Sequence, residues 1–427
     1  MSDASAQSIP GDDHPVRAVG RGYDPLAPLY NDDPYLFYAR ARRESPVSYS
    51  PTYNVWLITG HAEVLEVLRL PSVFSSAQNL ALPYAPPLEV QAILDEGYPP
   101  APGLFNNDPP GHTHARVLFA GAFTARRIAE LEPRIRDLAH RLVDGFARDG
   151  QADLVERFAF PLPMTVIADL LGVPREDMPK VKAWHNDWLS LFVPGAPLAR
   201  HMEAARSAVA YQRYYAALIE ERRARPRDDL ITALAEATVE GARFSMAEML
   251  SHMMILLSAG HETATDLIGH MVMHLLQHPE LWRAIDADPG LMGPAIEESV
   301  RFHAPVQAEP RVTTEEVVLG GVTIPRGARV HVVFASANRD PGVFPDPDRF
   351  DIQREHPTRH LGFGHGIQFC IGAPLARLET RVALEVLRER LPGLRIRPGF
   401  APEHVPDFYL RRLKHLHLEW ALPGAGA

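Results

Sequence analysis

The 427-residue chain contains a single cysteine, Cys370. A lone cysteine cannot form an intrachain disulfide, so the sequence excludes a disulfide-stapled secreted protein. It fits a reducing compartment instead, and we expect a cytoplasmic location. Three roles stay open for the side chain: a buried packing residue, a nucleophile or a metal ligand.

Long apolar runs and an excess of basic residues are also lacking. The longest apolar stretch, residues 253–276, is interrupted by His261, Glu262 and Asp266, which argues against a membrane span. Residues 1–21 contain no apolar segment of the kind that signal peptides and membrane anchors need. The net charge of −10 gives no electrostatic support to nucleic-acid binding. We therefore expect a protein that binds neither membranes nor nucleic acids.

The chain has ample material for a large core, because 46% of its residues are hydrophobic and only 22% are charged. Its 40 prolines are spread along the sequence and mark no linker, and no internal repeat is visible. We interpret residues 1–22 and 423–427 as loose tails. Residues 23–422 are then expected to form a single domain.

Helix signals dominate the sequence. Asp33 and Pro34 begin a predicted helix that runs through Arg43, because Asp is a good N-cap and Pro fits the first turn. A capping box at 245–248 begins a helix predicted to end near Gln277, about 50 Å long at 1.5 Å per residue. A short hairpin is predicted at 47–49 and 55–58, and a second β region at 311–323 and 328–334. The predicted fold class is mainly α with small β-sheets.

Cys370 lies in a glycine-rich segment, residues 363–372. Glycines at 364, 366 and 372 allow tight turns and a close approach of the backbone to a flat ligand. Residues 373–379 predict a helix start with proline in its first turn. Cys370 therefore precedes a helix N-terminus, where the helix dipole and unpaired N–H groups stabilise a thiolate. Such a thiolate suits an axial ligand of haem iron.

The same segment resembles the haem-binding loop of the cytochrome P450 family, Phe-Gly-x-Gly-x-His-x-Cys-x-Gly. The resemblance covers nearly all of the chain between the tails. It implies the P450 fold, a helical domain around haem b (iron protoporphyrin IX) with a minor β region. It also implies that Cys370 is the iron ligand and that Phe363 and Gly364 lie beside the cofactor. Gln368 stands where the family usually has His or Arg against a haem propionate, and Gln donates a hydrogen bond without charge.

An acid and a hydroxyl follow each other inside the long predicted helix, at Glu262 and Thr263. Such a pair is costly in an apolar helix, and Gly260 lowers helix propensity by about 1 kcal/mol while leaving room for a ligand. A solvated kink is the alternative interpretation of these residues. Residues 259–263 resemble the P450 motif Ala-Gly-x-Asp/Glu-Thr. The resemblance implies that Ala259 and Gly260 lie beside the cofactor and that Glu262 and Thr263 deliver protons during O2 cleavage.

Glu298 and Arg301 lie three residues apart, on one face of a predicted helix. By itself such a pair is usually a surface ion pair of little energetic value. Residues 295–301 also resemble the P450 motif Glu-x-x-Arg, and Arg349 resembles the third member of the family's Glu-Arg-Arg cluster. The resemblance implies a structural role for all three residues, which fix the segment leading to the cysteine loop.

The two propionates of haem need cations, and arginine offers bidentate donors. His112 and Arg116 lie four residues apart on one helix face and resemble family positions that contact the propionates. Arg311 resembles a third such position, on the strand after the Glu-x-x-Arg helix. For any one of these residues in isolation, solvent exposure would be the better interpretation. Their order and spacing relative to Cys370 favour the propionate contacts instead.

The resemblance implies a haem-thiolate monooxygenase that inserts one oxygen atom from O2 by hydroxylation or epoxidation. No flavin or iron–sulfur segment is visible, so we expect electrons from a separate ferredoxin (or flavodoxin) and its NAD(P)H reductase. Arg126, Arg127, Arg377 and Arg381 are a candidate basic patch for an acidic ferredoxin. We expect a monomer and a hydrophobic small-molecule substrate. Its predicted pocket residues are Phe105, Phe192, Leu256, Val306, Gln307 and Phe408.

Three other functions stay open at this point. A cysteine hydrolase would pair Cys370 with a histidine, although no base stands at a recognisable spacing. A peroxide-using P450 and a non-catalytic haem-binding protein would share the cysteine loop, but neither explains the acid–alcohol pair. His270, His274 and His278 recur every four residues, and we interpret them as a polar or interfacial stripe because nothing completes a zinc set.

Overall fold

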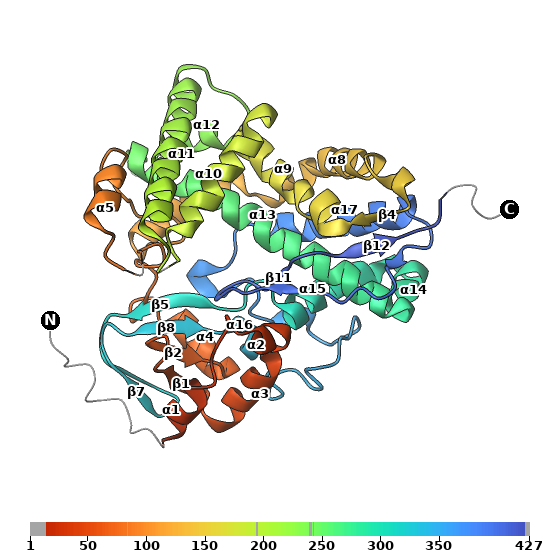
Figure 1. The fold of residues 1–427 in the computed structure, drawn as a ribbon, viewed down its shortest axis with the longest axis horizontal. Coiled ribbons are helices and arrows are strands. Elements are labelled where there is room, and N and C mark those ends of the chain that lie inside the picture. The colour runs from red at the N-terminus through yellow and green to blue at the C-terminus, as the bar shows by residue number, and fades with distance from the viewer. Residues whose placement is uncertain (1–13, 83, 194, 239–240, 242, 423–427) are drawn as a thin grey trace. The chain divides into compact units, whose positions relative to one another are not determined.

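The computed structural model describes residues 14–422, apart from 83, 194, 239–240 and 242 (Figure 1). These residues fall into two compact units. Unit 1 draws its described residues from 14–76, 128–163 and 262–422, and unit 2 draws them from 77–127 and 164–261. The single domain over 23–422 stays a prediction, and the tail expected at 423–427 lies outside the described residues.

Unit 2 is built from helices. Its largest, α11 (Leu198–Ala224), packs against α5, α10 and α12. The core between α5 and α11 includes Ala204, Ala205 and Ala208, whose small side chains let helices approach closely. The other elements of unit 2 are α5 (Leu88–Leu94), α6 (Gly111–Ala122), η4 (Arg175–Asp177), α10 (Met178–Ser190) and α12 (Leu230–Glu236).

Three helices run from one unit into the other: α7 (Ala125–Glu130), α9 (Pro161–Leu171) and α13 (Met246–Gln277). The predicted capping box of α13 is confirmed. The Glu248 backbone N–H donates to Ser245 Oγ at 3.3 Å, and the Ser245 N–H donates to the Glu248 carboxylate at 2.8 Å. The predicted end at Gln277 is confirmed as well.

The remaining helices belong to unit 1. In α3 the predicted cap is confirmed, because Asp33 Oδ1 accepts the Tyr35 N–H at 3.1 Å; the helix ends at Glu44, one residue later than predicted. The helical elements of unit 1 are α1 (Pro15–Gly20), α2 (Pro28–Asp32), α3 (Pro34–Glu44), α4 (His61–Arg69), α8 (Glu132–Asp144), η2 (Ala147–Asp149), η3 (Val155–Ala159), α14 (Pro279–Ala287), η5 (Pro289–Leu291), α15 (Met292–His303), α16 (Phe334–Ala337), η6 (Pro357–Arg359), η7 (Gly366–Gln368) and α17 (Ala373–Arg390).

A five-stranded sheet organises the first part of unit 1, with strand order β1-β2-β8-β5-β3. The predicted hairpin is confirmed as β1 (Val47–Ser50) and β2 (Val55–Ile58), in which Tyr49 faces Trp56. β2 pairs with β8 (Arg329–Val332) in parallel, and β8 pairs with β5 (Glu309–Thr313) antiparallel, as Figure 1 shows. β3 (Phe74–Ser75) completes the sheet.

The second β region is confirmed in outline and corrected at its end. It contains β5 and β8 with the hairpin of β6 (Val317–Leu319) and β7 (Val322–Ile324) between them. The strand predicted to reach residue 334 stops at Val332, because Phe334 begins α16. Four further short strands, β4 (Gln151–Asp153), β9 (Arg395–Ile396), β10 (His404–Val405), β11 (Arg412–Leu413), pair with one another or with β12 (His417–Glu419). The predicted fold class, mainly α with small sheets, is confirmed.

Part of the expected N-terminal tail is ordered. Residues 15–20 form α1, in which Val16 and Val19 are buried, so the prediction of a loose tail through residue 22 is wrong for these residues. Val16 gains burial in the core cluster beside β1, which a polar-looking sequence does not reveal. Residues 1–13 lie outside the described residues.

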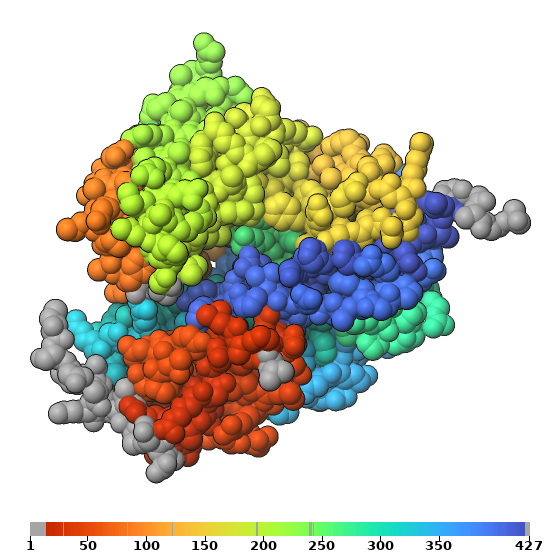
Figure 2. All heavy atoms as spheres, viewed as in Figure 1, coloured from red at the N-terminus to blue at the C-terminus, as the bar shows by residue number. Residues whose placement is uncertain are grey.

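The N-terminal and C-terminal segments of unit 1 are joined by hydrogen bonds. Arg411 donates to the backbone carbonyls of Asn31 and Asp32 at 2.7 and 2.9 Å, and Asn31 Nδ2 donates to the His404 carbonyl at 2.7 Å. In Figure 2 the two segments meet where red and dark blue spheres adjoin. Residues 373 to 380 positions apart in the sequence are thereby neighbours.

Candidate haem site

The cysteine loop is closed by its own backbone. The Cys370 N–H donates to the Phe363 carbonyl at 2.8 Å, and the Gly364 N–H donates to the Leu361 carbonyl at 2.8 Å. Gly364 has a φ of +73°, and a Cβ there would lie 3.1 Å from the Gln368 carbonyl oxygen. A glycine is therefore required at this turn. The loop leaves Cys370 exposed, three residues before α17 begins at Ala373.

A buried ion-pair cluster supports this loop from α15 and α17. Arg377 Nη2 lies 2.8 Å from Glu297 Oε2, and His360 Nε2 lies 3.2 Å from the same oxygen. Burial alone would raise the pKa of Glu297, but the hydrogen bonds from Arg377 and His360 lower it to about 2. The Arg377 guanidinium also lies 4.5 Å from the ring centre of Phe363, the residue that binds the Cys370 N–H.

Arg377 interacts electrostatically with the thiol as well. Its pKa is raised, first by its hydrogen bond to Glu297 and also by the charge of Cys370. The sequence prediction placed Arg377 in a docking patch, whereas the structure places it between the loop and Glu297. Sequence reasoning missed Glu297 and His360 altogether, because their partners lie 80 and 63 residues away.

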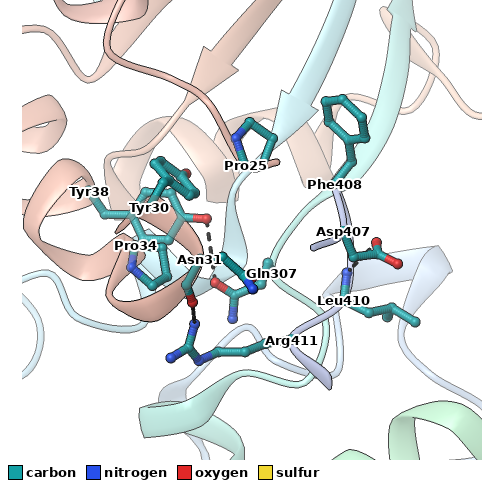
Figure 3. Close-up of a pocket in the computed structure, with 10 residues that line it drawn as sticks. All are labelled: Pro25, Tyr30, Asn31, Pro34, Tyr38, Gln307, Asp407, Phe408, Leu410 and Arg411. Carbon is teal, nitrogen blue, oxygen red and sulfur yellow. Dashed lines mark hydrogen bonds between the residues drawn. The ribbon is translucent and has the colours of Figure 1, made fainter. Parts of the chain in front are cut away.

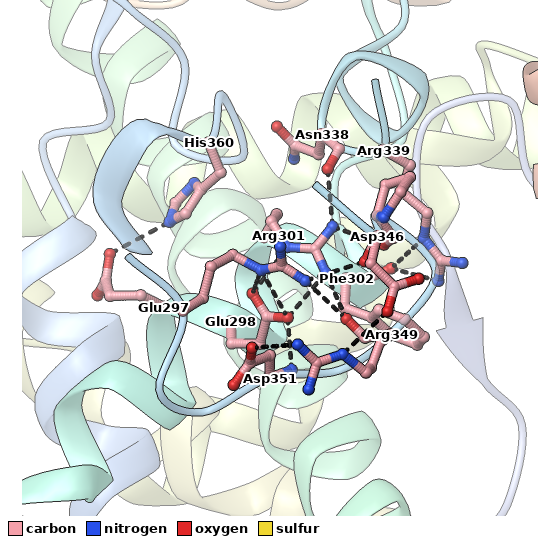
Figure 4. Close-up of polar contacts among 12 residues, drawn as sticks. Glu297, Glu298, Arg301, Phe302, Asn338, Arg339, Asp346, Arg349, Asp351 and His360 are labelled. Carbon is pink, nitrogen blue, oxygen red and sulfur yellow. Dashed lines mark hydrogen bonds and ion pairs between the residues drawn. The ribbon is translucent and has the colours of Figure 1, made fainter. Parts of the chain in front are cut away.

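The predicted Glu298–Arg301 pair is present and fully buried. Arg301 Nε and Nη2 donate to the two carboxylate oxygens of Glu298 at 2.7 and 2.8 Å, as Figure 4 shows. Arg301 Nη1 donates to the carbonyls of Asn338 and Pro347. The pair therefore connects α15 to the segment after α16, in agreement with the structural role implied for it.

The third member of this cluster is Arg354, and the prediction of Arg349 is wrong. Arg354 Nε lies 3.2 Å from both Glu298 oxygens, and its side chain is 6% exposed. The Arg349 side chain is 61% exposed and pairs with Asp346 and Asp351 (Figure 4). Only the backbone carbonyl of Arg349 joins the cluster, by accepting bonds from Arg301 and Arg354. The tight turns of residues 345–354 decide which arginine points inward.

Arg311, on β5, is a buried cation. Its side chain is almost inaccessible; Nη2 lies 3.0 Å from Glu309 Oε2 and Nη1 donates to the Pro310 carbonyl. A planar guanidinium held in this way keeps donors for an anionic ligand group. Gln368 is half-buried, and its Nε2 donates to Ser76 Oγ at 3.4 Å. Their contacts with propionates stay predictions.

In unit 2, His112 and Arg116 both lie on α6. His112 is buried, and neither ring nitrogen has a hydrogen-bond partner among the described residues. Burial lowers the pKa of His112, and the neighbouring charge of Arg116 adds to this effect, while Asp108 opposes it. A buried imidazole of this kind gains stability from a hydrogen-bonding ligand group.

The structure shows a packing reason for a glycine at position 260. A Cβ at this position would lie 2.5 Å from Ile167 Cγ1, so the glycine makes room for a side chain of α9. That Gly260 also lies beside the cofactor stays a prediction. α13 is assigned as α-helix over its whole length, Met246–Gln277. Ala259 and Gly260 belong to unit 2, whereas Glu262 and Thr263 belong to unit 1.

The predicted pocket residues divide between the units. Phe105, Phe192 and Leu256 belong to unit 2, and Val306, Gln307 and Phe408 belong to unit 1. Gln307 and Phe408 line a cavity of about 10 Å³ (Figure 3), which has room for roughly one water and not for a substrate.

The Gln307 side chain is already engaged. Its amide nitrogen donates to the His303 and Ala304 carbonyls and so caps the C-terminal end of α15. Its amide oxygen accepts a hydrogen bond from the Tyr38 hydroxyl. Phe408 packs its ring against Tyr53, with ring centres 5.1 Å apart. The role of these six residues in substrate binding stays a prediction.

The histidine stripe is mainly buried against other elements, so of the two interpretations, polar or interfacial, the polar one is wrong. His270 and His274 are enclosed, and only His278 is exposed. The His270 ring stacks on His303 and His404, with ring centres 5.0 and 5.4 Å apart. Among the described residues, no group of three or more His, Cys, Asp or Glu side chains could hold a metal ion.

Comparisons with known proteins decide the family. The model of the family described as Cytochrome P450 matches residues 48–288 and 291–390. The chain belongs to the cytochrome P450 family. The P450 is similar to cytochrome P450 107B1 from Saccharopolyspora erythraea, with 42% identity over 86% of this chain and 90% of that protein. It is also similar to the monooxygenase PikC from Streptomyces venezuelae, with 40% identity over 91% of each chain.

A solved structure agrees with this assignment. Cytochrome P450 CYP109Q5 from Chondromyces apiculatus is 37% identical, covers 94% of this chain and 99% of its own, and superimposes with a TM-score of 0.83. As a member of this family the chain is an oxidoreductase, a monooxygenase that binds haem. This result sets aside the cysteine hydrolase.

The donor groups of this P450 fit haem. The described residues include groups of the required chemistry: a thiol before a helix N-terminus at Cys370, a buried guanidinium at Arg311, and a buried imidazole at His112 whose nitrogens have no partner among the described residues. None of the described helices combines the length and apolar character needed to cross a bilayer.

Proposed function

We propose that this P450 holds haem b and hydroxylates or epoxidises a hydrophobic small molecule. The observation that carries the proposal is the cysteine loop, in which the only thiol of the chain follows a turn that requires Gly364. Bound there, haem would supply the redox chemistry that splits O2 and transfers one oxygen atom. Relatives named vitamin D(3) 25-hydroxylase and mycinamicin IV hydroxylase/epoxidase support the substrate class.

The cofactor contacts are assigned as follows. The Cys370 thiolate is the iron ligand, and Phe363 and Gly364 place it. Arg311 takes the main propionate load in unit 1 because it is buried and charged, while Gln368 adds a neutral hydrogen bond. His112 and Arg116 supply the propionate donors of unit 2.

The reaction also needs protons, and α13 provides them. Glu262 and Thr263 are proposed as the catalytic pair, with Thr263 donating a hydrogen bond where O2 is cleaved and Glu262 passing on protons. Ala259 and Gly260, one turn earlier, are proposed to face the cofactor. Two variants separate the contribution of the Thr263 hydroxyl from that of the rest of the side chain, because Thr263→Ser keeps the hydroxyl that Thr263→Ala removes.

Electrons are proposed to arrive from a separate ferredoxin (or flavodoxin) with its NAD(P)H reductase. Of the predicted basic patch, Arg377 pairs with Glu297, and Arg381 lies 2.6 Å from Glu132 and 3.2 Å from Glu385. These two arginines are therefore largely neutralised, while Arg126 and Arg127, both exposed, stay proposed members of the patch. We also propose that the protein acts as a cytoplasmic monomer.

The central test is spectroscopic. Cys370→Ser should abolish the thiolate-type spectrum of the reduced, CO-treated protein, because an alcohol cannot replace the anionic sulfur donor. Ile367→Ala is the matched control, since Ile367 is an exposed residue of the same loop. Turnover with NADH and a surrogate ferredoxin, compared with hydrogen peroxide alone, tests the electron source. If Cys370→Ser keeps both spectrum and turnover, the proposed function is wrong.

A further inference from the structure

Two carboxyl groups lie one turn apart on the same face of α13, at Glu262 and Asp266. The segment that contains β11 lies against this face. Arg412 Nη1 is 4.0 Å from Glu262 Oε1, and the Leu413 backbone N–H binds the Asp266 carboxyl group. All of these residues belong to unit 1.

Arg412 is held in place by a turn. Its Nη2 lies 2.8 Å from Asp407 Oδ2, while Asp407 Oδ1 accepts the backbone N–H groups of Tyr409 and Leu410 at 2.8 and 3.0 Å. Figure 3 shows the Asp407 carboxylate beside Leu410. An arginine does not release its proton at any physiological pH, so Arg412 orients its neighbours and is not itself a proton carrier.

Exposure decreases steadily along this cluster. The Arg412 and Asp407 side chains are 31% and 21% exposed, and Glu262 is 10% exposed. Asp266 is only 3% exposed, and its Oδ2 has no hydrogen-bond partner among the described residues. The cluster therefore connects solvent with a buried carboxyl group beside the catalytic pair.

The environment of Asp266 favours its protonated form. Burial is the main reason that its pKa lies well above the usual range, and the charges of Glu262 and Asp407 raise it further. Arg412 and the Leu413 N–H act in the opposite direction but do not compensate for burial. A carboxyl group that keeps its proton at neutral pH can serve as a proton donor.

We propose that Asp266 recharges Glu262 with a proton during each turnover, and that Arg412 positions the two carboxyl groups at the solvent edge. The inference rests on the proposed role of Glu262. The transfer converts protonated Asp266 and ionised Glu262 into ionised Asp266 and protonated Glu262. Glu262 then passes its proton on to the reaction, and solvent returns one proton to Asp266 past the Arg412–Asp407 pair, so that each cycle moves one proton from solvent to the reaction. The Arg412 guanidinium lies 4.0 Å from Glu262 Oε1, so its charge stands beside the carboxylate that receives the proton.

The first measurement does not depend on activity. Infrared spectroscopy of the haem-loaded protein at pH 7 should show a protonated carboxyl band that Asp266→Asn removes. Glu379→Gln is the matched control, because Glu379 is an equally buried carboxyl group with a raised pKa, but it lies on α17. Its substitution should remove a different component of the band and leave turnover unchanged.

The second measurement concerns proton delivery. Asp266→Asn should slow turnover about tenfold and increase the solvent deuterium isotope effect, while leaving the CO spectrum unchanged. The defect should shrink as the pH is lowered, because solvent then supplies protons to the site more readily. Arg412→Gln, at a partly exposed site that tolerates change, should slow turnover several-fold, and Arg412→Lys should restore part of the loss.

The outcomes separate this inference from the proposed function. If Asp266→Asn keeps the parental rate and isotope effect while Glu262→Gln does not, Asp266 is not a proton donor, although Glu262 keeps its role. If Glu262→Gln also has no effect in a protein with a normal CO spectrum, the proposed catalytic pair fails as well. If Asp266→Asn does not fold, a parental rate in Arg412→Gln overturns the inference.

Discussion

At the scale of single residues, the orientation of a side chain decides its role more than its motif does. Arg349 and Arg354 lie five residues apart, and both could reach Glu298 as far as the sequence shows. Only Arg354 does so, because the turn between them directs Arg349 to solvent. The same distinction applies to Arg377. The sequence suggested it as part of a basic docking patch, whereas in the structure it binds Glu297.

Replacing Arg354 by Ala should destabilise the protein by about 3–5 kcal/mol, because it leaves the buried Glu298 with one cation fewer. Replacing Arg349 by Ala, the matched control, should cost less than about 1 kcal/mol, since its pairs are exposed. Urea denaturation of the haem-loaded protein measures both changes. Equal losses would mean that Arg349 carries as much of the cluster as Arg354.

At the scale of elements, α13 illustrates how packing explains a residue that a motif assigns to function. Gly260 lies against Ile167 of α9, so its missing side chain is a requirement of helix–helix contact. The histidines at the other end of α13 show the same principle. They pack as aromatic rings, and His270 Nδ1 donates to the Asp266 carbonyl at 2.8 Å.

A Gly260→Ala substitution should therefore destabilise the protein by about 1–3 kcal/mol, the usual cost of overpacking a core. In an Ile167→Ala background the added methyl group finds room, so Gly260→Ala should cost much less there. A double-mutant cycle of denaturation free energies tests this coupling. Simple additivity of the two changes would contradict the proposed contact.

The buried histidines make stability depend on pH. Burial lowers the pKa of His270 and His274 to about 3 and that of His404 to about 2. In the unfolded chain these side chains bind protons below about pH 6.5, whereas the folded protein does not, so stability falls as the pH falls from about 6.5. The loss continues down to the folded-state pKa values.

His274→Phe should reduce this acid sensitivity, because a phenyl ring can occupy the aromatic site beside Phe350 without titrating. Between pH 6 and 5 the variant should lose about 1 kcal/mol less free energy of unfolding than the parent protein. The difference in free energy of unfolding between the variant and the parent protein at pH 8 gives the contribution of packing alone. An unchanged slope would show that His274 binds its proton equally in the folded and unfolded states.

At the scale of the whole molecule, unit 1 is assembled from segments far apart in the sequence. α1 packs beside β1, β12 pairs with β4, and Arg411 binds the end of α2. Each contact closes a long loop, and the loss of chain entropy has to be offset by burial and hydrogen bonding elsewhere. The ends of the described chain are therefore structural parts of the P450.

Arg411→Met should cost about 3 kcal/mol, because two hydrogen bonds from a buried cation to the carbonyls of α2 are lost. Limited proteolysis should then cleave the segment around α2 faster. Lys414→Met is the matched control, since Lys414 is an exposed residue in the same C-terminal segment. Equal protease resistance of Arg411→Met and the parent protein would show that the two ends are held together by other contacts.

Local patterns were sufficient for much of this protein. The caps at Asp33 and Ser245, the β1–β2 hairpin and the glycine-rich loop around Cys370 depend on neighbouring residues, so the sequence predicted them correctly. The P450 family, and with it haem binding and monooxygenase activity, also followed from short motifs, because the chemistry at an iron needs those residue types in that order.

Long-range contacts were decided only by the tertiary structure. The partnership of Arg354 with Glu298, the packing of Gly260 against Ile167, and the approach of Arg412 to Glu262 join residues 56, 93 and 150 positions apart. No periodicity or capping rule connects such positions, because their proximity results from how helices and strands pack. The sequence alone therefore determined which chemistry this P450 performs, whereas tertiary packing decided which side chains support it.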